Sequence, residues 1–475
     1  MRKWLALQLA LCFVMAGVPS SAEGLRLLPA DQFANWYYAN PSGIRDIGDP
    51  QIFFAEGAYW CVATSSAFGY RIWRSEDLVN WDCQEAPAYS RSKESWSRGN
   101  FWAPEVYPYK GRYYLFYSAR CKGKWDGMRI GIAAADHPEG PYVDLAPEPL
   151  FDPGYSVIDA SFFVDDDGAP YLFYARDCSE NVVDGVRESH VYGVRLKDDL
   201  SAPVGEPVAL TRPDQAWEQD SGPEWLWNEG PIVLKNGDQY HLFYSANYYA
   251  SKKYGVGCAV SKSPLGPYVK NSSNPLMRFM EWEGETLVSG PGHNSFLTTQ
   301  AGDETFIVYH IHADPKVAGD DRQMCLDRMG FLADGTPYVN GPTLYPQLKP
   351  LEMIGMVSLL PQAVADSKAA ECLHDGDYGI SPLGGLGGRS FQGEATFRWS
   401  EPVSIQALLI YPAPGASGEC SLSLGGGRTL TFELSEREKL PGASFRFHFE
   451  PVSATEVSIR TDGAVCEVIA LGAQP

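Results

Sequence analysis

Short runs of apolar and aromatic residues alternate along most of the chain with stretches rich in Gly, Pro, Asn and Asp. Almost no segment places apolar residues at the three- and four-residue spacing that an amphipathic helix needs. Short strands separated by turns are typical of β-proteins, so the pattern predicts an all-β fold. The exception is the N-terminus, where Arg2 and Lys3 precede a largely apolar run from Leu5 to Gly17.

One pattern recurs five times at intervals of about sixty residues, a length that holds four short strands. Each copy begins with a small or polar residue, continues as an apolar strand, turns, and ends in a second strand rich in aromatic residues. The copies begin at Asp49, Ala103, Asp159, Glu229 and His293. This repeat predicts a five-bladed β-propeller, in which the innermost strand of each blade lines a central channel.

Four of these starting residues are ionisable, although a blade needs no charge there for packing. Equivalent positions in a propeller project towards the same end of the axis, so Asp49, Asp159, Glu229 and His293 are predicted to meet. The competing interpretation is that they are turn or strand-end residues, a common place for Asp. Unrelated turn residues would not converge on one axis, and convergence therefore favours a functional site.

The chain changes in character after the repeats. Residues 351–475 carry glycine-rich loops around alternating strands such as Ile405 to Tyr411. A chain of this length exceeds one ordinary core. We therefore expect two domains: the propeller over residues 23–350 and a β-sandwich over residues 351–475.

The apolar N-terminal run is too short to span a bilayer, and no later stretch is long and apolar enough. Its positive start and the small residues Ser20, Ser21 and Ala22 are typical of a signal peptide. We predict a signal peptide over residues 1–22 and a secreted or periplasmic protein. A buried N-terminal helix is the alternative.

Composition narrows the class of ligand. The formal net charge is −21, which repels nucleic acid and anionic lipid and suits a neutral polymer substrate. The ten cysteines form no CxxC pair or Cys/His cluster, which argues against zinc. No phosphate-binding glycine loop or nucleophile elbow is present, so no organic cofactor is predicted.

Six motifs in order, at blade spacing, resemble those of the family 43 glycoside hydrolases, a family of five-bladed propellers. The resemblance extends from Asp46 to about Pro346 in the propeller region. Its motifs are Gly48-Asp49-Pro50, Trp102-Ala103-Pro104-Glu105-Val106, Ile158-Asp159-Ala160-Ser161-Phe162-Phe163, Asn228-Glu229-Gly230-Pro231, Gly290-Pro291-Gly292-His293-Asn294, and Arg322 before Asp327-Arg328. The region after residue 350 is similar, more loosely, to discoidin-like galactose-binding sandwiches.

The resemblance implies three catalytic residues: Asp49 as general base, Glu229 as general acid, and Asp159 as the carboxylate that orients the acid and raises its pKa. Two carboxyl groups are sufficient to cleave a glycosidic bond, and their separation decides the stereochemical outcome. A gap wide enough for one water predicts inversion in a single step. The third carboxylate disfavours a second negative charge and so keeps the acid protonated.

The resemblance also implies a role for three further residues. Trp102 would form part of the sugar-binding wall, and Arg322 would reach the substrate at the channel mouth. His293 would face a hydrated calcium ion in the channel. One imidazole with waters would make this ion structural and electrostatic, because calcium prefers oxygen ligands.

The predicted function is therefore hydrolysis of terminal pentosides of plant-type oligo- or polysaccharides, by an α-L-arabinofuranosidase or a β-xylosidase. An endo-arabinanase, an exo-galactosidase and a non-catalytic carbohydrate-binding propeller remain alternatives. The sandwich is expected either to bind carbohydrate or to serve as a structural cap. The sequence makes no prediction of the oligomeric state.

Overall fold

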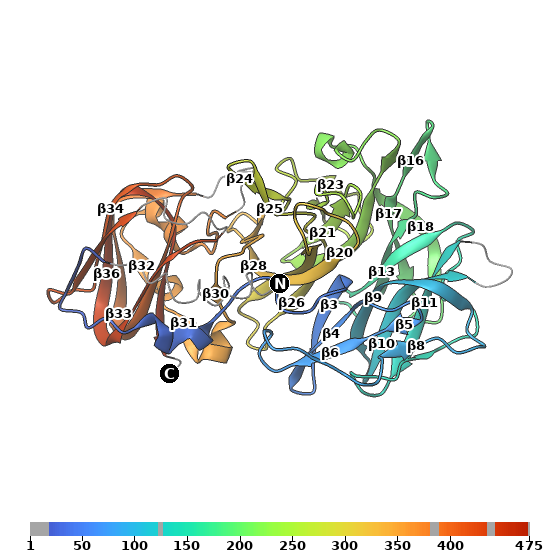
Figure 1. The fold of residues 1–475 in the computed structure, drawn as a ribbon, viewed down its shortest axis with the longest axis horizontal. Coiled ribbons are helices and arrows are strands. Elements are labelled where there is room, and N and C mark those ends of the chain that lie inside the picture. The colour runs from blue at the N-terminus through green and yellow to red at the C-terminus, as the bar shows by residue number, and fades with distance from the viewer. Residues whose placement is uncertain (1–18, 122–126, 381–388, 435–441, 474–475) are drawn as a thin grey trace. The chain divides into compact units, whose positions relative to one another are not determined.

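The computed structural model describes residues 19–121, 127–380, 389–434 and 442–473 (Figure 1). In these ranges the chain forms strands almost throughout, and its helices are short 3₁₀ turns. This confirms the predicted all-β fold. None of the helices in the described ranges is long and apolar enough to cross a membrane.

The chain divides into two compact units. The propeller unit comprises Pro41–Gln300 and Phe306–Leu326, and the sandwich unit comprises Met1–Asn40, Ala301–Thr305 and Asp327–Pro475. The sandwich unit thus takes in segments on both sides of the predicted domain boundary at residue 350.

Five four-stranded sheets form the blades, which confirms the predicted five-bladed propeller. Blades 1 to 5 consist, in order, of β3 (Gly48–Ala55), β4 (Ala58–Thr64), β6 (Ile72–Ser75) and β7 (Asp82–Cys83); β9 (Ser97–Tyr109), β10 (Arg112–Cys121), β11 (Met128–Ala135) and β12 (Val143–Asp144); β13 (Val157–Val164), β14 (Pro170–Arg176), β17 (His190–Leu196) and β18 (Pro203–Thr211); β20 (Asn228–Asn236), β21 (Gln239–Ala246), β22 (Gly255–Ser261) and β23 (Val269–Lys270); and β26 (Gly292–Thr298), β27 (Thr305–His312), β28 (Arg322–Phe331) and β29 (Pro337–Val339).

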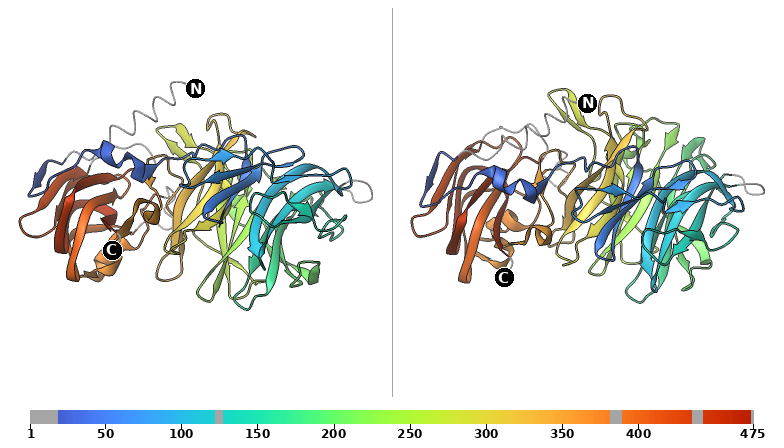
Figure 2. Two further views of the ribbon diagram at one scale, coloured as in Figure 1. Left: turned by 90° about the horizontal axis from the view of Figure 1, so that it is seen from below. Right: turned by 60° about the horizontal axis from the view of Figure 1, so that its bottom comes forward.

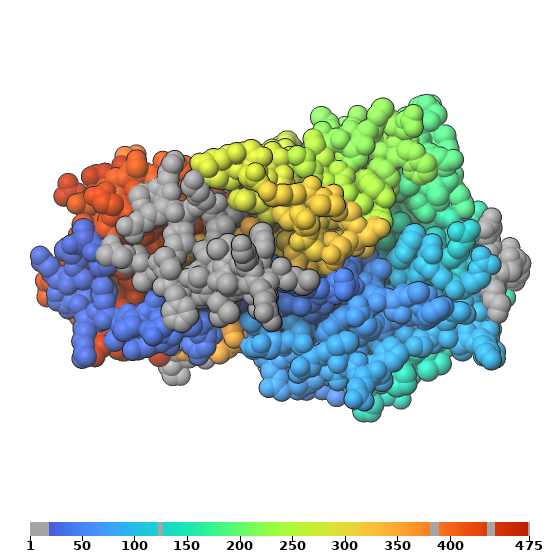
Figure 3. All heavy atoms as spheres, viewed as in Figure 1, coloured from blue at the N-terminus to red at the C-terminus, as the bar shows by residue number. Residues whose placement is uncertain are grey.

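The inner strands close into a ring. Strand β3 packs against β9, β9 against β13, β13 against β20, β20 against β26, and β26 against β3 again. Figure 2 shows these sheets in two further views, and in Figure 3 the yellow surface of blade 5 lies beside the blue surface of blade 1. A closed ring brings the beginnings of all five inner strands to one place.

Aromatic side chains fill the space between neighbouring blades, which explains the aromatic-rich second strand of each repeat. Phe116 of blade 2 stacks on Phe162 of blade 3 with ring centroids 4.9 Å apart. Phe243 of blade 4 meets Phe296 of blade 5 edge to face at 4.7 Å. Pairs of this kind add to the free energy of burial because the edge of one ring is attracted to the face of the other.

Shorter strands connect and extend the blades. They are β5 (Gly69–Tyr70) with β8 (Tyr89–Ser90), β15 (Val182–Val183) with β16 (Val186–Glu188) and β19 (Trp225–Leu226), and β24 (Met280–Trp282) with β25 (Glu285–Val288). A 3₁₀ turn, η2 (Ala216–Gln219), precedes β19.

The sandwich unit has its own sheet and core. Its sheet runs β1 (Ser21–Glu23), β35 (Thr429–Leu434), β34 (Gly418–Ser423), β36 (Phe445–Ala473), β33 (Phe391–Pro412) and β32 (Val364–Ala365), with β31 (Met356–Ser358) paired to β36. A second pair joins β2 (Tyr37–Tyr38) to β30 (Gln347–Leu348), and the 3₁₀ turns are η1 (Ala30–Trp36), η3 (Leu351–Ile354), η4 (Leu360–Gln362) and η5 (Lys368–His374). Leu408, Ile459 and Phe447 lie in its core. Carbohydrate binding by this unit stays a prediction.

The predicted signal peptide lies mostly outside the described residues, which begin at residue 19. Ser21–Glu23 forms the edge strand β1, whose Ala22 pairs with Leu430 of β35. Cleavage after Ala22 would therefore shorten an edge strand without touching the inner strands. All cysteines in the described ranges are free.

Candidate active site

Each inner strand of the propeller contains one residue in the left-handed region of backbone conformation that precedes its apolar stretch. Their φ angles lie between 45° and 60°, at Asp49, Ala103, Asp159, Gly230 and His293. In blades 1 to 4 the strand register shifts at this residue, as in a β-bulge. Non-glycine residues rarely adopt this conformation, and such strain concentrates at functional sites.

The alignment of the repeats in blade 4 was wrong by one residue. Glu229 corresponds in register to Gly48, Trp102 and Ile158, each of which stands directly before the bulge. The bulge residue of blade 4 is Gly230. Glu229 therefore reaches the site from a different backbone position than the other acids, because the bulge turns consecutive side chains in different directions.

Side chains from neighbouring blades hold the bulges in place. Each bulge N–H donates to a side-chain atom of the preceding blade in the ring: Ala103 to Thr64 Oγ1 at 2.8 Å, Asp159 to Ser118 Oγ at 2.8 Å, Gly230 to Asp159 Oδ2 at 2.9 Å, His293 to Ser245 Oγ at 2.7 Å, and Asp49 to His310 Nδ1 at 3.2 Å. The five bonds close a circle around the channel, so the position of each catalytic candidate depends on the neighbouring blade.

Blade 3 has no hydroxyl to bind the bulge of the next blade, and this difference positions Asp159. Ser118 and Ser245 lie opposite the residue before the bulge of their own blade, and in blade 3 this place is taken by Ala175. Without a hydroxyl there, the N–H of Gly230 binds the carboxylate of Asp159 instead. This bond holds Asp159 beside the backbone that carries Glu229.

Asp49 is held as an anion. Its Oδ2 accepts a hydrogen bond from Thr64 at 2.6 Å, its Oδ1 accepts one from Arg322 at 3.0 Å, and His293 Nδ1 lies 3.4 Å from Oδ1. Burial opposes ionisation, but His293, Arg322, His310 and Thr64 together outweigh it and lower the pKa of Asp49 well below its usual range. Burial and the nearby Arg322 lower the pKa of His310, so its neutral ring can accept from the N–H of Asp49.

The pKa values of Glu229 and Asp159 are shifted in the opposite direction to that of Asp49. Both side chains are buried, at 8 % and 7 % exposure, and burial is the main reason that both pKa values are raised. The charge of Asp159 raises the pKa of Glu229 further, and that of Asp49 adds to the effect. Tyr254 donates a hydrogen bond to Glu229 Oε1 at 2.9 Å, which opposes the rise only in part.

His293 does not belong to a protein cage for calcium. In the ranges that the structure describes, no three His, Cys, Asp or Glu side chains are grouped to hold a metal ion. Calcium takes six to eight oxygen ligands, and a single imidazole leaves nearly all of them to water. No step proposed below depends on calcium. The ion at His293 stays a prediction, tested by removing divalent ions with EDTA and measuring kcat.

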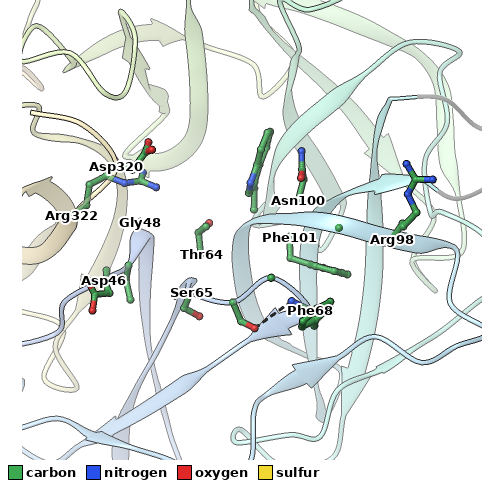
Figure 4. A pocket seen from close by; sticks show the side chains of 15 residues that line it. Asp46, Gly48, Thr64, Ser65, Phe68, Arg98, Asn100, Phe101, Asp320 and Arg322 are labelled. Carbon is green, nitrogen blue, oxygen red and sulfur yellow. Dashed lines mark hydrogen bonds between the residues drawn. The ribbon is translucent and has the colours of Figure 1, made fainter.

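A pocket of about 640 Å³, the size of ligand sites in general, is lined by Gly48, Thr64 and Arg322 (Figure 4). Thr64 and Arg322 donate hydrogen bonds to Asp49. Arg322 and Trp102 both line the pocket, and Trp102 is 37 % exposed. Gly48 lies against the Arg322 guanidinium, where a Cβ would meet Cζ at 2.2 Å. The structure thus brings the two predicted substrate-binding residues to one pocket, whose wall also includes Thr64, a hydrogen-bond partner of Asp49.

Several site residues were not predicted from the sequence. Thr64, Tyr254 and His310 contact the acids directly but lie on second and third strands of the blades or just before them. A usable signal exists for Thr64, Ser118 and Ser245, because a hydroxyl recurs at the end of the second strand in three repeats.

The chain is similar to known glycoside hydrolases in sequence and in fold. A beta-D-galactofuranosidase from Aspergillus niger is 29% identical over 323 residues, which cover 63% of this chain and 81% of that protein. An extracellular exo-alpha-(1->5)-L-arabinofuranosidase from Streptomyces avermitilis is 25% identical over 71% of this chain and 69% of its own length. The solved structure of a thermostable family-43 glycoside hydrolase is 42% identical, with a TM-score of 0.62, and covers 66% of this chain and 99% of that chain.

The sequence pattern of the glycosyl hydrolases family 43 matches residues 38–337, which include the five left-handed positions of the inner strands and every candidate catalytic residue. The chain therefore belongs to family 43 of the glycosyl hydrolases, a family of inverting glycosidases.

Proposed function

We propose that the enzyme releases terminal pentose units, α-L-arabinofuranosyl or β-xylosyl, from neutral plant-type polysaccharides. Asp49 acts as general base and Glu229 as general acid, while Asp159 orients the acid and keeps it protonated. One observation carries the proposal: within a single buried site the pKa of Asp49 is lowered and that of Glu229 is raised. Carboxyl groups whose pKa values are pushed apart are suited to the two opposite roles.

The chemistry follows from these protonation states. Glu229 gives its proton to the glycosidic oxygen as the bond to the anomeric carbon breaks. Asp49 takes a proton from a water that attacks the opposite face, and the product has inverted configuration. Arg322 and Trp102, at the wall of the pocket, bind the sugar that is released.

The relatives support the choice of sugar. Two of the relatives named above bear the names beta-D-galactofuranosidase and exo-alpha-(1->5)-L-arabinofuranosidase, and a further relative from Escherichia coli bears the name putative beta-xylosidase at 26% identity. A β-D-galactofuranosidase is the second candidate, because galactofuranose and arabinofuranose share a five-membered ring. The extracellular relatives and the predicted leader also support export of the protein.

A panel of nitrophenyl glycosides tests the function. We expect cleavage of the α-L-arabinofuranoside or the β-D-xyloside in preference to the β-D-galactofuranoside, and proton NMR during turnover should show the inverted anomer first. With an unactivated oligosaccharide as substrate, whose leaving oxygen needs a proton, Glu229→Gln and Asp49→Asn should each lower kcat by 100-fold or more, in the range general acid–base catalysis contributes. Wild-type activity in either variant, or a retained anomer, would refute the assigned roles.

A further inference from the structure

A row of aromatic rings leads away from the active site. Arg322, which binds Asp49, lies over the ring of Tyr249, with its guanidinium carbon 5.0 Å from the centroid. Tyr249 meets Tyr248 at 4.9 Å, Tyr248 meets Trp227 at 5.4 Å, and Trp227 is stacked with Trp225 at 6.3 Å and 18°. We call Trp225, Trp227, Tyr248 and Tyr249 the aromatic row.

The row comes from segments that precede and follow strands of blade 4. Trp225 lies in β19, which pairs in parallel with β16, and Trp227 stands two residues before Glu229 in the chain. Tyr248 and Tyr249 follow β21, the second strand of blade 4, after Asn247. The Arg187 guanidinium lies 4.9 Å from the Trp225 ring and supports it from β16.

Two of these rings are exposed to solvent. Trp225 is 41% exposed and Tyr248 is 42% exposed, Trp227 and Tyr249 are half-buried, and none of the four is a member of the hydrophobic cluster between blades 3 and 4. Trp217, by contrast, packs against the core between blades 3 and 4. Contiguous exposed aromatic surface on a folded protein indicates a binding site.

The row is continuous with the pocket at its inner end. Tyr249 donates a hydrogen bond to Asp320 at 2.6 Å, and both Asp320 and Arg322 line the pocket. Because a general acid protonates the leaving-group oxygen, the surface beside Glu229 faces the leaving group. The aromatic row therefore meets the pocket wall at Arg322 and Asp320 and includes Trp227, which stands two residues before Glu229 in the chain.

We propose that the aromatic row binds the sugar units on the leaving-group side of the cleaved bond in a neutral oligosaccharide. This inference rests on the proposed roles of Glu229 and Asp49. Pyranose and furanose rings present apolar C–H faces that stack on flat aromatic rings, and such stacking needs no charge on the ligand. A net charge of −21 disfavours an acidic glycan on the same surface.

The experiment compares two chain lengths of one sugar. The enzyme and its Trp225→Ala and Tyr248→Ala variants are given a disaccharide and a pentasaccharide, each as α-1,5-linked arabinose and as β-1,4-linked xylose. The ratio of kcat/KM for pentasaccharide over disaccharide should fall about tenfold in each variant, mainly through KM, as expected for one lost stacking contact. Tyr171→Ala removes a half-buried ring at the opposite end of blade 3 and should leave the ratio unchanged.

Binding measurements distinguish the role of the aromatic row from the proposed catalytic function. Calorimetry with the pentasaccharides in a Glu229→Gln background should show about tenfold weaker affinity when Trp225→Ala is added. An unchanged kcat/KM ratio together with unchanged affinity overturns the role of the row. If the wild type binds pentasaccharide through the row but cleaves no substrate, the proposed function fails and the binding surface stands. If no pentasaccharide binds, the row is not a glycan site.

Discussion

The hydroxyl of Thr64 makes two buried contacts at once. It accepts the N–H of Ala103, the bulge residue of blade 2, and donates to Oδ2 of Asp49. Because a single oxygen joins the proposed base to the neighbouring blade, Thr64 fixes the direction from which Asp49 approaches the attacking water. Thr64 is thus a positioning residue for the base.

Replacing Thr64 by Val should lower kcat up to about 100-fold, since a small misplacement of a reacting group has effects of this size. Loss of the hydrogen bond also raises the pKa of Asp49, so the acidic limb of the kcat/KM profile should move to higher pH. Thr64→Ser keeps the hydroxyl and should restore most of the activity. An unchanged acidic limb in a folded Thr64→Val enzyme would contradict the positioning role.

Two substitutions around Glu229 should move the alkaline limb in opposite directions. Asp159→Asn removes a negative charge that raises the pKa of Glu229, so the acid loses its proton at lower pH and the limb moves down. Tyr254→Phe removes a hydrogen bond that stabilises the carboxylate, so the pKa of Glu229 rises further and the limb moves up. Profiles of kcat/KM against pH measure both shifts. Movement in the same direction would show that Glu229 does not set this limb.

The sequence predicted functional residues where they stand at equivalent positions of the repeats, and it missed those that stand elsewhere. Asp49, Asp159 and His293 stand at equivalent bulges, so spacing alone brings them together. Glu229 was one residue out of alignment, because a bulge adds a residue that no hydrophobic pattern reveals. Tyr254 comes from the third-strand side of its blade, and only the closed ring shows that it reaches the acid.

At the scale of the element, the blade is the unit that the sequence predicts and the bulge is the detail that it misses. Alternating apolar strands and aromatic-rich second strands were sufficient to place all five sheets. The register shifts depend on side chains of the preceding blade, such as Ser118 under Asp159 and Ser245 under His293. Interactions between segments so distant in sequence are not visible in a local pattern.

Blade 4 contains a buried ion pair whose loss should be costly. Lys270 Nζ lies 2.6 Å from Glu218 Oε1, and the two side chains are 9% and 0% exposed. Glu218 also accepts from the backbone of Asp214 and Gln215 and from Asn228, the neighbour of Glu229. The pair therefore ties η2 and β23 to the strand that carries the acid.

Lys270→Met should lower the free energy of unfolding by about 3–5 kcal/mol, because it leaves a buried carboxylate without its partner. Lys262→Met is the matched control, since Lys262 and Asp238 are 63% and 83% exposed and belong to the same blade. Urea denaturation measures both variants. Equal midpoints for the two variants would show that the buried pair does not support blade 4.

At the scale of the whole molecule, the chain carries an excess of acid, and part of it lies inside the sandwich unit. Asp375, Asp377 and Glu467 lie together, and Glu467 accepts the N–H of Gly376 between the two aspartates. Burial, followed by the neighbouring acids, raises the pKa of Asp375 to about 6 and that of Glu467 well above its usual value. Asp375 Oδ2 is buried with no hydrogen-bond partner among the described residues.

These raised values make the stability of the sandwich unit depend on pH with a definite sign. A carboxyl whose pKa is higher in the folded state holds its proton more firmly there, so folding is favoured at low pH. Stability is then lost as the pH rises from the unfolded value near 4 through the folded value of about 6 for Asp375. The reverse holds for Asp49. Its pKa is lowered in the folded state, so its ionisation adds stability at pH values above the pKa of the unfolded state.

Asp375→Asn should remove part of the stability loss that the wild type shows as the pH rises. The amide keeps an oxygen to accept the N–H of Asp377, as Oδ1 of Asp375 does now, and adds no charge. Scanning calorimetry of the full chain should therefore show a melting temperature a few degrees above wild type at pH 8 and equal to it at pH 4. Glu433→Gln removes an exposed acid from β35 of the same unit and should give a difference that does not change with pH in this way. A gain for Asp375→Asn that is the same at both pH values would show that the pKa of Asp375 does not differ between the folded and unfolded states.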